Sequence, residues 1–203
     1  MISAAMFPLG SVLFPHALLP LHVFEPRYRV MMRHCLEGDK EFGVVLIERG
    51  SEVGGGDVRF DVGTLARIVQ ANELPDGRWA VACVGLQRLL VEEWLPDDPF
   101  PLARVELLRE PTVGPDAYAA HDAVRAALAD VLQLWHQLDE RVPTEVPEVA
   151  DDPTRGLFEL AALAPIGPLD AQAVLAAPDV PARGTLLTEL LADRAQEIRA
   201  RLR

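Results

Sequence analysis

The side chains that most often carry catalysis are scarce in this chain and poorly spaced for it. Lysine occurs once, as Lys40, and it lies between Asp39 and Glu41. A phosphate-binding P-loop needs a glycine-rich turn that ends in Gly-Lys-Ser or Gly-Lys-Thr, because backbone amides and the lysine hold the phosphates together. The acidic neighbours of Lys40 exclude this kind of nucleotide site.

Nucleophilic catalysis is equally hard to assemble from the residues available. The serines are Ser3, Ser11 and Ser51, with Lys40 as the one lysine that could activate them. A cysteine nucleophile would be Cys35 or Cys83, with a base drawn from His34, His121 and His136. His34 and Cys35 are adjacent, and adjacent residues on a helix do not face each other. We therefore expect no catalytic residue and a protein that is not an enzyme.

Metal and cofactor sites are not indicated either. His16 and His22 lie in a proline-rich segment with Glu25 close by, and no His-x-x-x-His or Cys-x-x-Cys spacing supports them. We interpret these three residues as polar groups at the rim of a fold. Gly54-Gly55-Gly56 lacks the strand-to-helix setting of a dinucleotide-binding turn. We interpret it as a flexible loop, and we expect no metal and no cofactor.

Composition narrows the class of protein further. Half of the 203 residues are hydrophobic, which argues against disorder, and the net charge of −12 opposes binding to nucleic acid. The amino terminus lacks the basic start of a secretory signal, and no apolar run reaches the roughly 18 residues of a membrane span. Cys35 and Cys83 lie far apart, so we interpret them as buried free thiols. We expect a soluble, cytoplasmic protein with no nucleic-acid and no membrane partner.

The elements that must position any site begin with a proline-rich opening segment, Phe7 to Arg29. Its apolar residues occur in pairs and singles between four prolines, Pro8, Pro15, Pro20 and Pro26. Proline fixes its own φ, removes a backbone donor and biases the preceding residue toward extended backbone. A long helix is therefore excluded. The segment predicts an extended, largely buried ribbon, followed by a helix from about Pro26 to Glu37.

The chain from about residue 6 to 110 has the pattern of a β-rich half. Short apolar and β-branched runs predict strands at Phe42 to Glu48, Val62 to Leu74, Trp79 to Val84, Leu86 to Trp94 and Leu102 to Leu108. Pro75-Asp76-Gly77 joins the second run to the third as a hairpin turn. About six strands with one helix among them predict a closed or nearly closed barrel, which protects the sheet edges.

Helical periodicity replaces this pattern in the second half. Apolar residues recur at three- and four-residue intervals from Tyr118 to Leu138, and Asp152-Pro153 has the form of a helix start. Two further helices are predicted, one from Leu169 to Ala176 and one from Pro181 onward. The expected fold class is α+β, with a β-rich subdomain over 1–112 and a helical bundle subdomain over 113–203 packed against it.

Several short sequence segments, taken together, resemble the amino-terminal domain family of Lon proteases. They are the opening Pro-Leu, Phe-Pro and Pro-Leu pairs, Val62-Gly-Thr-Leu-Ala-Arg-Ile-Val69, Leu74-Pro-Asp-Gly77 and Val84-Gly-Leu-Gln-Arg-Leu89. Phe158 to Leu175, with the leucine-rich helix after it, is a looser match to the helical region of that family. The resemblance implies a PUA-like β-pseudobarrel followed by a helical bundle. It also implies a stand-alone member of the family that lacks the ATPase and protease domains.

What the resemblance implies about function is substrate recognition. In full-length Lon proteases this domain helps to bind unfolded or tagged substrates. We therefore expect unfolded or extended polypeptides as partners, and an adaptor or regulator role in protein quality control. Another protein as partner and the oligomeric state are left open. PUA folds often bind RNA, but fold does not establish function, and the acidic balance of this chain opposes RNA binding.

A peptide-binding surface is expected on the opening segment. Its apolar residues are too many for one small barrel to enclose, so some could line a groove against the helical half. The candidate residues are Phe14, Leu18, Leu21, Phe24, Glu25, Arg27 and Tyr28. Glu25 and Arg27 would form a charged rim. The alternative is that the apolar members are core residues and the charges pair locally.

Two other functions stay open on the sequence alone. One is a hydrolase with a site between the two subdomains, which a convergent polar cluster with shifted pKa values would favour. The other is a small-molecule-binding module of the PUA-like type, which a deep closed pocket would favour.

Overall fold

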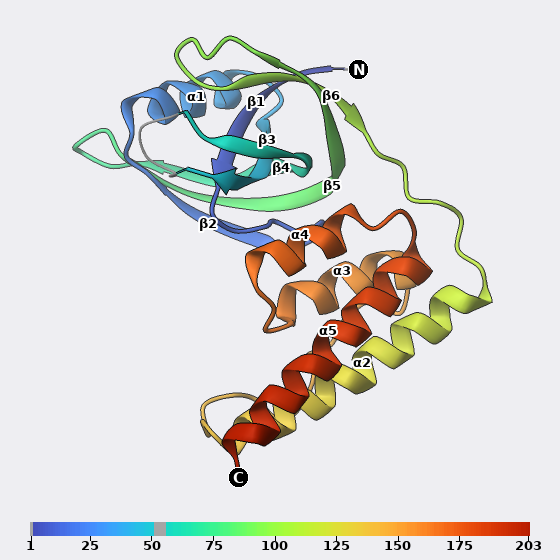
Figure 1. Ribbon diagram of the computed structural model, residues 1–203. Coiled ribbons are helices and arrows are strands. Elements are labelled where there is room, and N and C mark those ends of the chain that lie inside the picture. The colour runs from blue at the N-terminus through green and yellow to red at the C-terminus, as the bar shows by residue number, and fades with distance from the viewer. Residues whose placement is uncertain (1, 51–55) are drawn as a thin grey trace. The chain divides into compact units, whose positions relative to one another are not determined.

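The computed structural model describes residues 2–50 and 56–203, which form two compact units (Figure 1). The first unit, Met1–Arg109, is the barrel unit, and the second, Glu110–Arg203, is the helical unit. Most of the predicted loop at Gly54-Gly55-Gly56 lies outside the described residues. Within the described ranges, no helix is both long and apolar enough to cross a bilayer. The predicted packing of the two subdomains against each other stays a prediction.

The barrel unit is a six-stranded mixed sheet with one helix. Its elements are β1 (Ile2–Leu9), β2 (Leu18–Val23), α1 (Pro26–Glu37), β3 (Glu41–Arg49), β4 (Val58–Glu73), β5 (Trp79–Leu95) and β6 (Leu102–Leu107). β1 pairs with β3 in parallel, and the other strand pairs are antiparallel. The strands β5, β4, β3, β1 and β6 close into a ring, because β6 pairs with both β1 and β5. The predicted α+β class with a barrel of about six strands is confirmed.

β5 is one continuous strand, and the prediction of two strands separated near Gly85 was wrong. β4 pairs along one edge of β5. On the other edge, Trp79–Val84 pairs with β2, and Leu89–Leu95 pairs with β6. Gly85 lies where the partner on this edge changes, so it marks an exchange of neighbours and not the end of a strand.

Helix α1 supplies one wall of the main core of the barrel unit. Its buried residues are Tyr28, Met31, Met32 and Cys35, which follow the i, i+3, i+4, i+7 spacing of a single helix face. They join a cluster that includes Phe7 and Phe42 from the strands. Each such side chain contributes about 1.5–3 kcal/mol when it is fully buried. Pro26 lies in the first turn, where its fixed φ suits a helix start, and the predicted helix from Pro26 to Glu37 is confirmed.

The helical unit contains α2 (Pro115–His136), α3 (Pro153–Leu163), α4 (Pro168–Ala176) and α5 (Val180–Arg201). Each of these helices has a proline in its first turn, where the missing N–H removes no helical hydrogen bond. Two aspartates cap helices: Asp152 accepts from the Thr154 N–H at 3.1 Å, and Asp179 from the Ala182 N–H at 2.8 Å. Helices α2 and α5 run side by side and form the main packing of the unit (Figure 1). The predicted helices are confirmed, and the last two begin one residue earlier than predicted.

A buried arginine ties the start of the helical unit to its last helix. Arg183 on α5 is completely buried, and its guanidinium carbon lies 3.8 Å from the centroid of the Phe158 ring of α3. Its Nη2 donates to Glu110 Oε2 at 3.0 Å. The charge is therefore held by an aromatic face and a carboxylate, the arrangement that makes a buried guanidinium tolerable.

Both cysteines are free and buried, as predicted. Burial raises the pKa of the Cys35 thiol to about 11, and burial together with the nearby Cys35 raises the pKa of Cys83 to about 12. Because the thiolate is the reactive form, we expect both thiols to react with an aromatic disulfide reagent at least about 100-fold more slowly in the native protein than in denaturant. Absorbance of the released thiolate measures the two rates. Equal rates in the two conditions would contradict the burial of these residues.

Candidate functional site

A pocket of about 200 Å³ lies where β2 leads into α1, and we call it the β2–α1 pocket. It is lined by Phe7, Leu9, Pro20, Leu21, His22, Val23, Phe24, Glu25 and Tyr28. All of these residues belong to the barrel unit and to the opening segment. Mainly apolar walls with a few polar groups are the composition of a site that binds an apolar side chain.

The prolines of the segment shape this pocket. Pro20 lies within β2, where a proline is tolerated because β2 is an edge strand. Pro26 favours extended backbone at Glu25, which adopts φ −65° and ψ 136°, and it starts α1. Phe24 therefore lies between the end of a strand and the start of a helix. Phe24 as a whole is 54% exposed although it lines a pocket, which makes it a candidate for contact with a ligand.

Phe7 and Tyr28 form an aromatic pair in the wall of the pocket. Their rings are stacked, with centroids 4.2 Å apart and an interplanar angle of 17°. Burial raises the pKa of Tyr28 to about 12, an increase that the charge of Arg27 opposes and that of Glu25 supports. The phenol therefore stays neutral near pH 7.

Glu25 and Arg27 form a charged rim beside this pair. Arg27 Nε lies 3.3 Å from Glu25 Oε2, and the Arg27 guanidinium carbon lies 4.5 Å from the centroid of the Tyr28 ring. The two predicted rim residues thus pair with each other, which agrees with the alternative that the charges of the opening segment pair locally. Both side chains keep partial exposure, so their outer atoms stay accessible to a ligand.

A second charged group, built on Asp57, Arg59 and Trp94, was not predicted. Arg59 Nε lies 2.5 Å from Asp57 Oδ2, and the Arg59 guanidinium carbon lies 4.4 Å from the Trp94 ring centroid. These residues line a broader hollow of about 480 Å³. Burial alone would raise the pKa of Asp57, but the Arg59 hydrogen bond and charge, assisted by the charge of Arg27, hold that pKa below its usual range.

Sequence reasoning missed this group because no spacing links its members. The antiparallel pairing of β4 with β5, in which Val62 lies opposite Leu90, brings Arg59 toward Trp94. The one available signal was an arginine set among apolar residues of a strand, as in Val58-Arg-Phe60. Such a residue needs a partner, but the partner is found only in the fold.

The predicted site residues fall into three groups. Leu21, Phe24, Glu25 and Tyr28 line the β2–α1 pocket, and Arg27 lies at its rim. Leu18 begins β2 and is 75% exposed, but it does not line the pocket. Phe14 is only 4% exposed, so it supports the turn before β2 from inside and presents no surface to a ligand.

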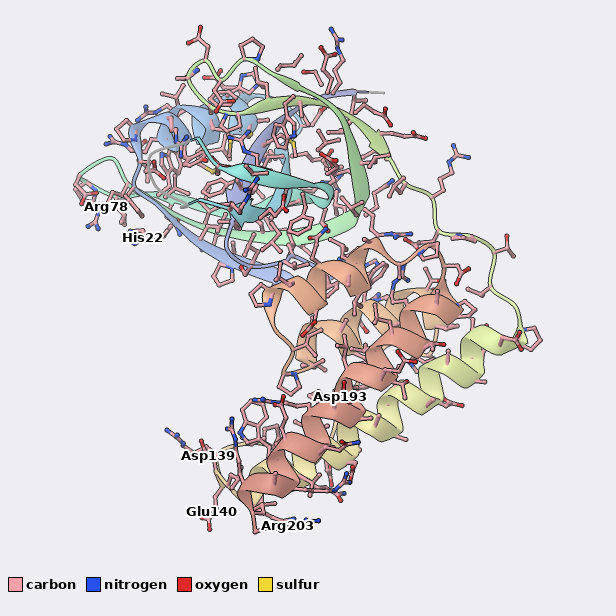
Figure 2. The ribbon with its side chains drawn as sticks, in the orientation of Figure 1. His22, Arg78, Asp139, Glu140, Asp193 and Arg203 are labelled. Carbon is pink, nitrogen blue, oxygen red and sulfur yellow. The ribbon has the colours of Figure 1, made fainter. Side chains whose placement is uncertain are left out.

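The histidines of the opening segment do not gather around a metal position. The side chains of His16 and His22 are exposed, and Figure 2 shows His22 pointing outward from the barrel unit. In residues 2–50 and 56–203, no group of three or more His, Cys, Asp or Glu residues has the geometry of a metal site. What the pocket offers a ligand is aromatic and aliphatic surface, one imidazole and one carboxylate.

Comparisons with known proteins cover nearly the whole chain. The family model described as the ATP-dependent protease La (LON) substrate-binding domain matches residues 3–193. The Lon protease of Escherichia coli (strain K12) is 32% identical over 185 residues, which cover 88% of this chain and 23% of the relative. Lon protease 2 of Myxococcus xanthus is 29% identical over 193 residues, which cover 93% of this chain and 23% of the relative. The chain spans about a quarter of the length of these curated relatives.

Two solved structures are similar over nearly their full length. The Lon N-terminal domain protein from Xanthomonas campestris has a TM-score of 0.64 and 27% identity, with 95% of this chain and 98% of that chain covered. The N-terminal domain of the Mycobacterium avium complex Lon protease has a TM-score of 0.67 and 15% identity, with 95% and 99% covered. At the lower identity, the likeness concerns the fold alone.

Proposed function

Because the chain belongs to the family of Lon substrate-binding domains, we propose that it binds unfolded or extended polypeptides through the β2–α1 pocket. The observation that carries this proposal is the half-exposed ring of Phe24 beside an apolar pocket. A ligand that covers this ring and fills the pocket removes apolar surface from water on both partners. Unfolded chains offer exposed leucine, valine and phenylalanine side chains for this purpose, whereas folded proteins bury most of theirs.

The exposed apolar residues of β2 extend the proposed contact beyond the pocket itself. Leu18 is the first residue of β2 and Phe24 directly follows its last, and both are more than half exposed. An extended ligand lying along β2 would meet both side chains, with the pocket at one end. Contact over this length favours a polypeptide segment over a compact small molecule.

The charged groups around the pocket would adjust which segments bind. Glu25 and Arg27, at the rim of the pocket, carry one charge of each sign. A rim of mixed sign rejects neither acidic nor basic flanking residues, because each finds an opposite charge nearby. We therefore propose a broad preference for apolar segments without a strict charge requirement.

The role we propose is recognition without catalysis, as an adaptor or regulator in protein quality control. The matched family model is that of a substrate-binding domain, and the pocket residues described above offer binding surface in place of a nucleophile and base.

Phe24→Ala tests this function. We expect it to weaken binding of a probe peptide about tenfold, because truncating a central aromatic contact costs about 1–2 kcal/mol. The probe is a short fluorescein-labelled peptide in which leucine and valine alternate with serine and threonine between terminal lysines. Fluorescence anisotropy measures its Kd.

The matched control is Tyr118→Ala. Tyr118 is 53% exposed, nearly the same as Phe24, but it lies on α2 in the helical unit. We expect this variant to bind the probe peptide like the unaltered protein. Two results would refute the proposed function. One is that the Phe24→Ala variant binds the probe as tightly as the unaltered protein does. The other is that the unaltered protein binds the probe no more tightly than it binds a peptide of serine, threonine and lysine alone.

A further inference from the structure

We propose that β2 binds its polypeptide ligand by strand addition, with the ligand backbone pairing along the free edge of β2. This rests on the proposed function and specifies how the same surface recognises its ligand. Recognition would then depend on main-chain hydrogen bonds as well as on the apolar side chains that enter the pocket.

Among the residues that the structure describes, no strand pairs with the second edge of β2. The strand order is β2-β5-β4-β3-β1-β6, and the ring closes through pairing of β5 with β6. β2 therefore lies outside the ring and pairs with β5 alone among the strands of the described residues. The edge of β2 that faces away from β5 is therefore open, and an open edge is a template for another extended chain.

The register identifies the residues that face the open edge. The Gly85 N–H donates to the Ala17 carbonyl at 3.0 Å, so Ala17 directs its backbone groups toward β5. In an antiparallel pair, the residues that exchange hydrogen bonds alternate with those that do not. By this alternation Leu19, Leu21 and Val23 bond to β5, while Leu18, Pro20 and His22 direct their backbone groups to the open edge.

Proline gives an independent check on this assignment. Pro20 has no N–H, so it fits β2 only where no ladder bond to β5 is needed. The alternation derived from Ala17 puts Pro20 in that outward set. The side chains of Leu18, Pro20 and His22 are all exposed, so a chain can approach this edge.

The edge therefore offers a defined set of hydrogen-bonding groups. Leu18 and His22 each provide an N–H and a carbonyl, and Pro20 between them provides a carbonyl alone. Only an extended main chain supplies donors and acceptors at the matching repeat, which makes a polypeptide the occupant that this edge selects. The missing donor at Pro20 keeps the pairing weak, and a weak, reversible contact is what a receptor for many different segments needs.

The added strand would lie next to the β2–α1 pocket. Pro20 and His22 belong both to the open edge and to the pocket lining. Neighbouring strands lie about 4.8 Å apart, so a ligand strand on this edge would place alternate side chains beside the pocket. Strand addition and pocket filling are thus compatible in one ligand.

Two substitutions on β2 test the backbone contribution. We expect His22→Pro, which deletes an outward N–H, to bind the probe peptide about fivefold more weakly than His22→Ala, which keeps it, because one hydrogen bond contributes about 1 kcal/mol. We expect Pro20→Ala, which restores an outward N–H, to bind the probe two- to fivefold more tightly than the unaltered protein, on the same scale. If Pro20 contributed only the apolar surface of its ring to the pocket, Pro20→Ala would weaken binding of the probe and would not strengthen it.

Modified ligands test the same idea on the unaltered protein and need no variant to fold. The probe peptide is compared with a version that is N-methylated at every residue between the lysines, which keeps its side chains and removes its backbone donors. We expect methylation to weaken binding at least about tenfold, because two or more main-chain hydrogen bonds are lost. Both peptides are measured by competition against the labelled probe.

The outcomes separate this inference from the proposed function. If Phe24→Ala weakens binding while the methylated peptide binds as well as the probe, the pocket function stands and strand addition is wrong. If the His22→Pro and His22→Ala variants bind equally while both remain folded by circular dichroism, strand addition is likewise overturned. If the unaltered protein binds no apolar peptide, both proposals fail together.

Discussion

Replacing Gly85 with alanine is expected to destabilise the barrel unit by about 3 kcal/mol, because a side chain at this point of β5 meets backbone that cannot move aside. A Cβ on Gly85 would overlap the carbonyl oxygen of Phe14 and would lie 3.1 Å from its carbonyl carbon and 3.2 Å from Pro15 Cα. These atoms belong to the main chain, so relief requires the whole turn before β2 to shift.

The same turn is fastened to Gly85 by two hydrogen bonds. The His16 N–H donates to the Gly85 carbonyl at 2.8 Å, and the Gly85 N–H donates to the Ala17 carbonyl at 3.0 Å. His16 also adopts the left-handed conformation, with φ 67°, which a non-glycine residue keeps only when its surroundings hold it. A shift of this turn would therefore displace β2, so the Gly85→Ala variant should also lose affinity for the probe peptide.

Urea titration of the Gly85→Ala variant measures the effect on stability. Tryptophan fluorescence in a Trp135→Phe background reports the barrel unit through Trp79 and Trp94. Gly38→Ala is the matched control, because a Cβ there meets its nearest atoms at 3.8 Å, an ordinary contact. Equal midpoints for the two variants would show that the Gly85 contact is relieved at no cost.

Replacing Arg183 with alanine is expected to destabilise the helical unit by about 4 kcal/mol, the largest effect that we predict. The substitution removes the cation that stacks on Phe158 and binds Glu110, and it leaves a cavity where a completely buried side chain had been. Alanine cannot fill that volume, and helices α3 and α5 would have to collapse toward each other to recover the lost contacts.

Arg183→Met separates the volume from the charge. Methionine keeps much of the packing, and the Glu110 side chain, at 19% exposure, retains contact with water once its partner is gone. We therefore expect Arg183→Met to cost less than half as much as Arg183→Ala. Urea titration followed by Trp135 fluorescence, with Trp79 and Trp94 replaced by phenylalanine, reports this unit.

Arg199→Ala provides the control for removal of an arginine as such. Arg199 also lies on α5 and donates to Asp130 of α2 at 2.6 Å, but both side chains are about half exposed. An exposed pair of this kind contributes at most about 1 kcal/mol. If Arg183→Ala and Arg199→Ala lowered the free energy of unfolding equally, burial of Arg183 would contribute nothing to stability.

Most of the fold was predictable because proline and periodicity act locally. Pro26 and Pro153 begin helices for reasons contained in the residue itself, and the Pro75-Asp76-Gly77 turn joins β4 to β5 as expected. Gly85 misled because glycine commonly interrupts strands, whereas here it admits a neighbouring backbone. That neighbour, the turn at Phe14 and Pro15, is distant in sequence and invisible to any local pattern.

The candidate site was predictable only as a segment. The prolines break the two-residue alternation that normally tells the inner face of a strand from the outer, so the pattern could not tell the buried Phe14 from the exposed Leu18. The group of Asp57, Arg59 and Trp94 could not be predicted from the sequence, because its members come together only when β4 pairs with β5. Composition singled out the opening segment, and the register of β2 on β5 decided which backbone groups of that segment face outward.

Because β2 lies outside the closed ring of strands, it can separate from the barrel unit without opening that ring. Opening of β2 breaks its pairing with β5 and leaves every hydrogen bond of the ring in place. Such partial opening has a lower free energy than global unfolding, and elements that open this way are the ones that exchange partners on the timescale of native-state fluctuations. Opening would also withdraw Leu19, Leu21 and Val23 of β2 from the main core that they share with the ring strands, so the pairing with β5 and these core contacts together set the free energy of the open state.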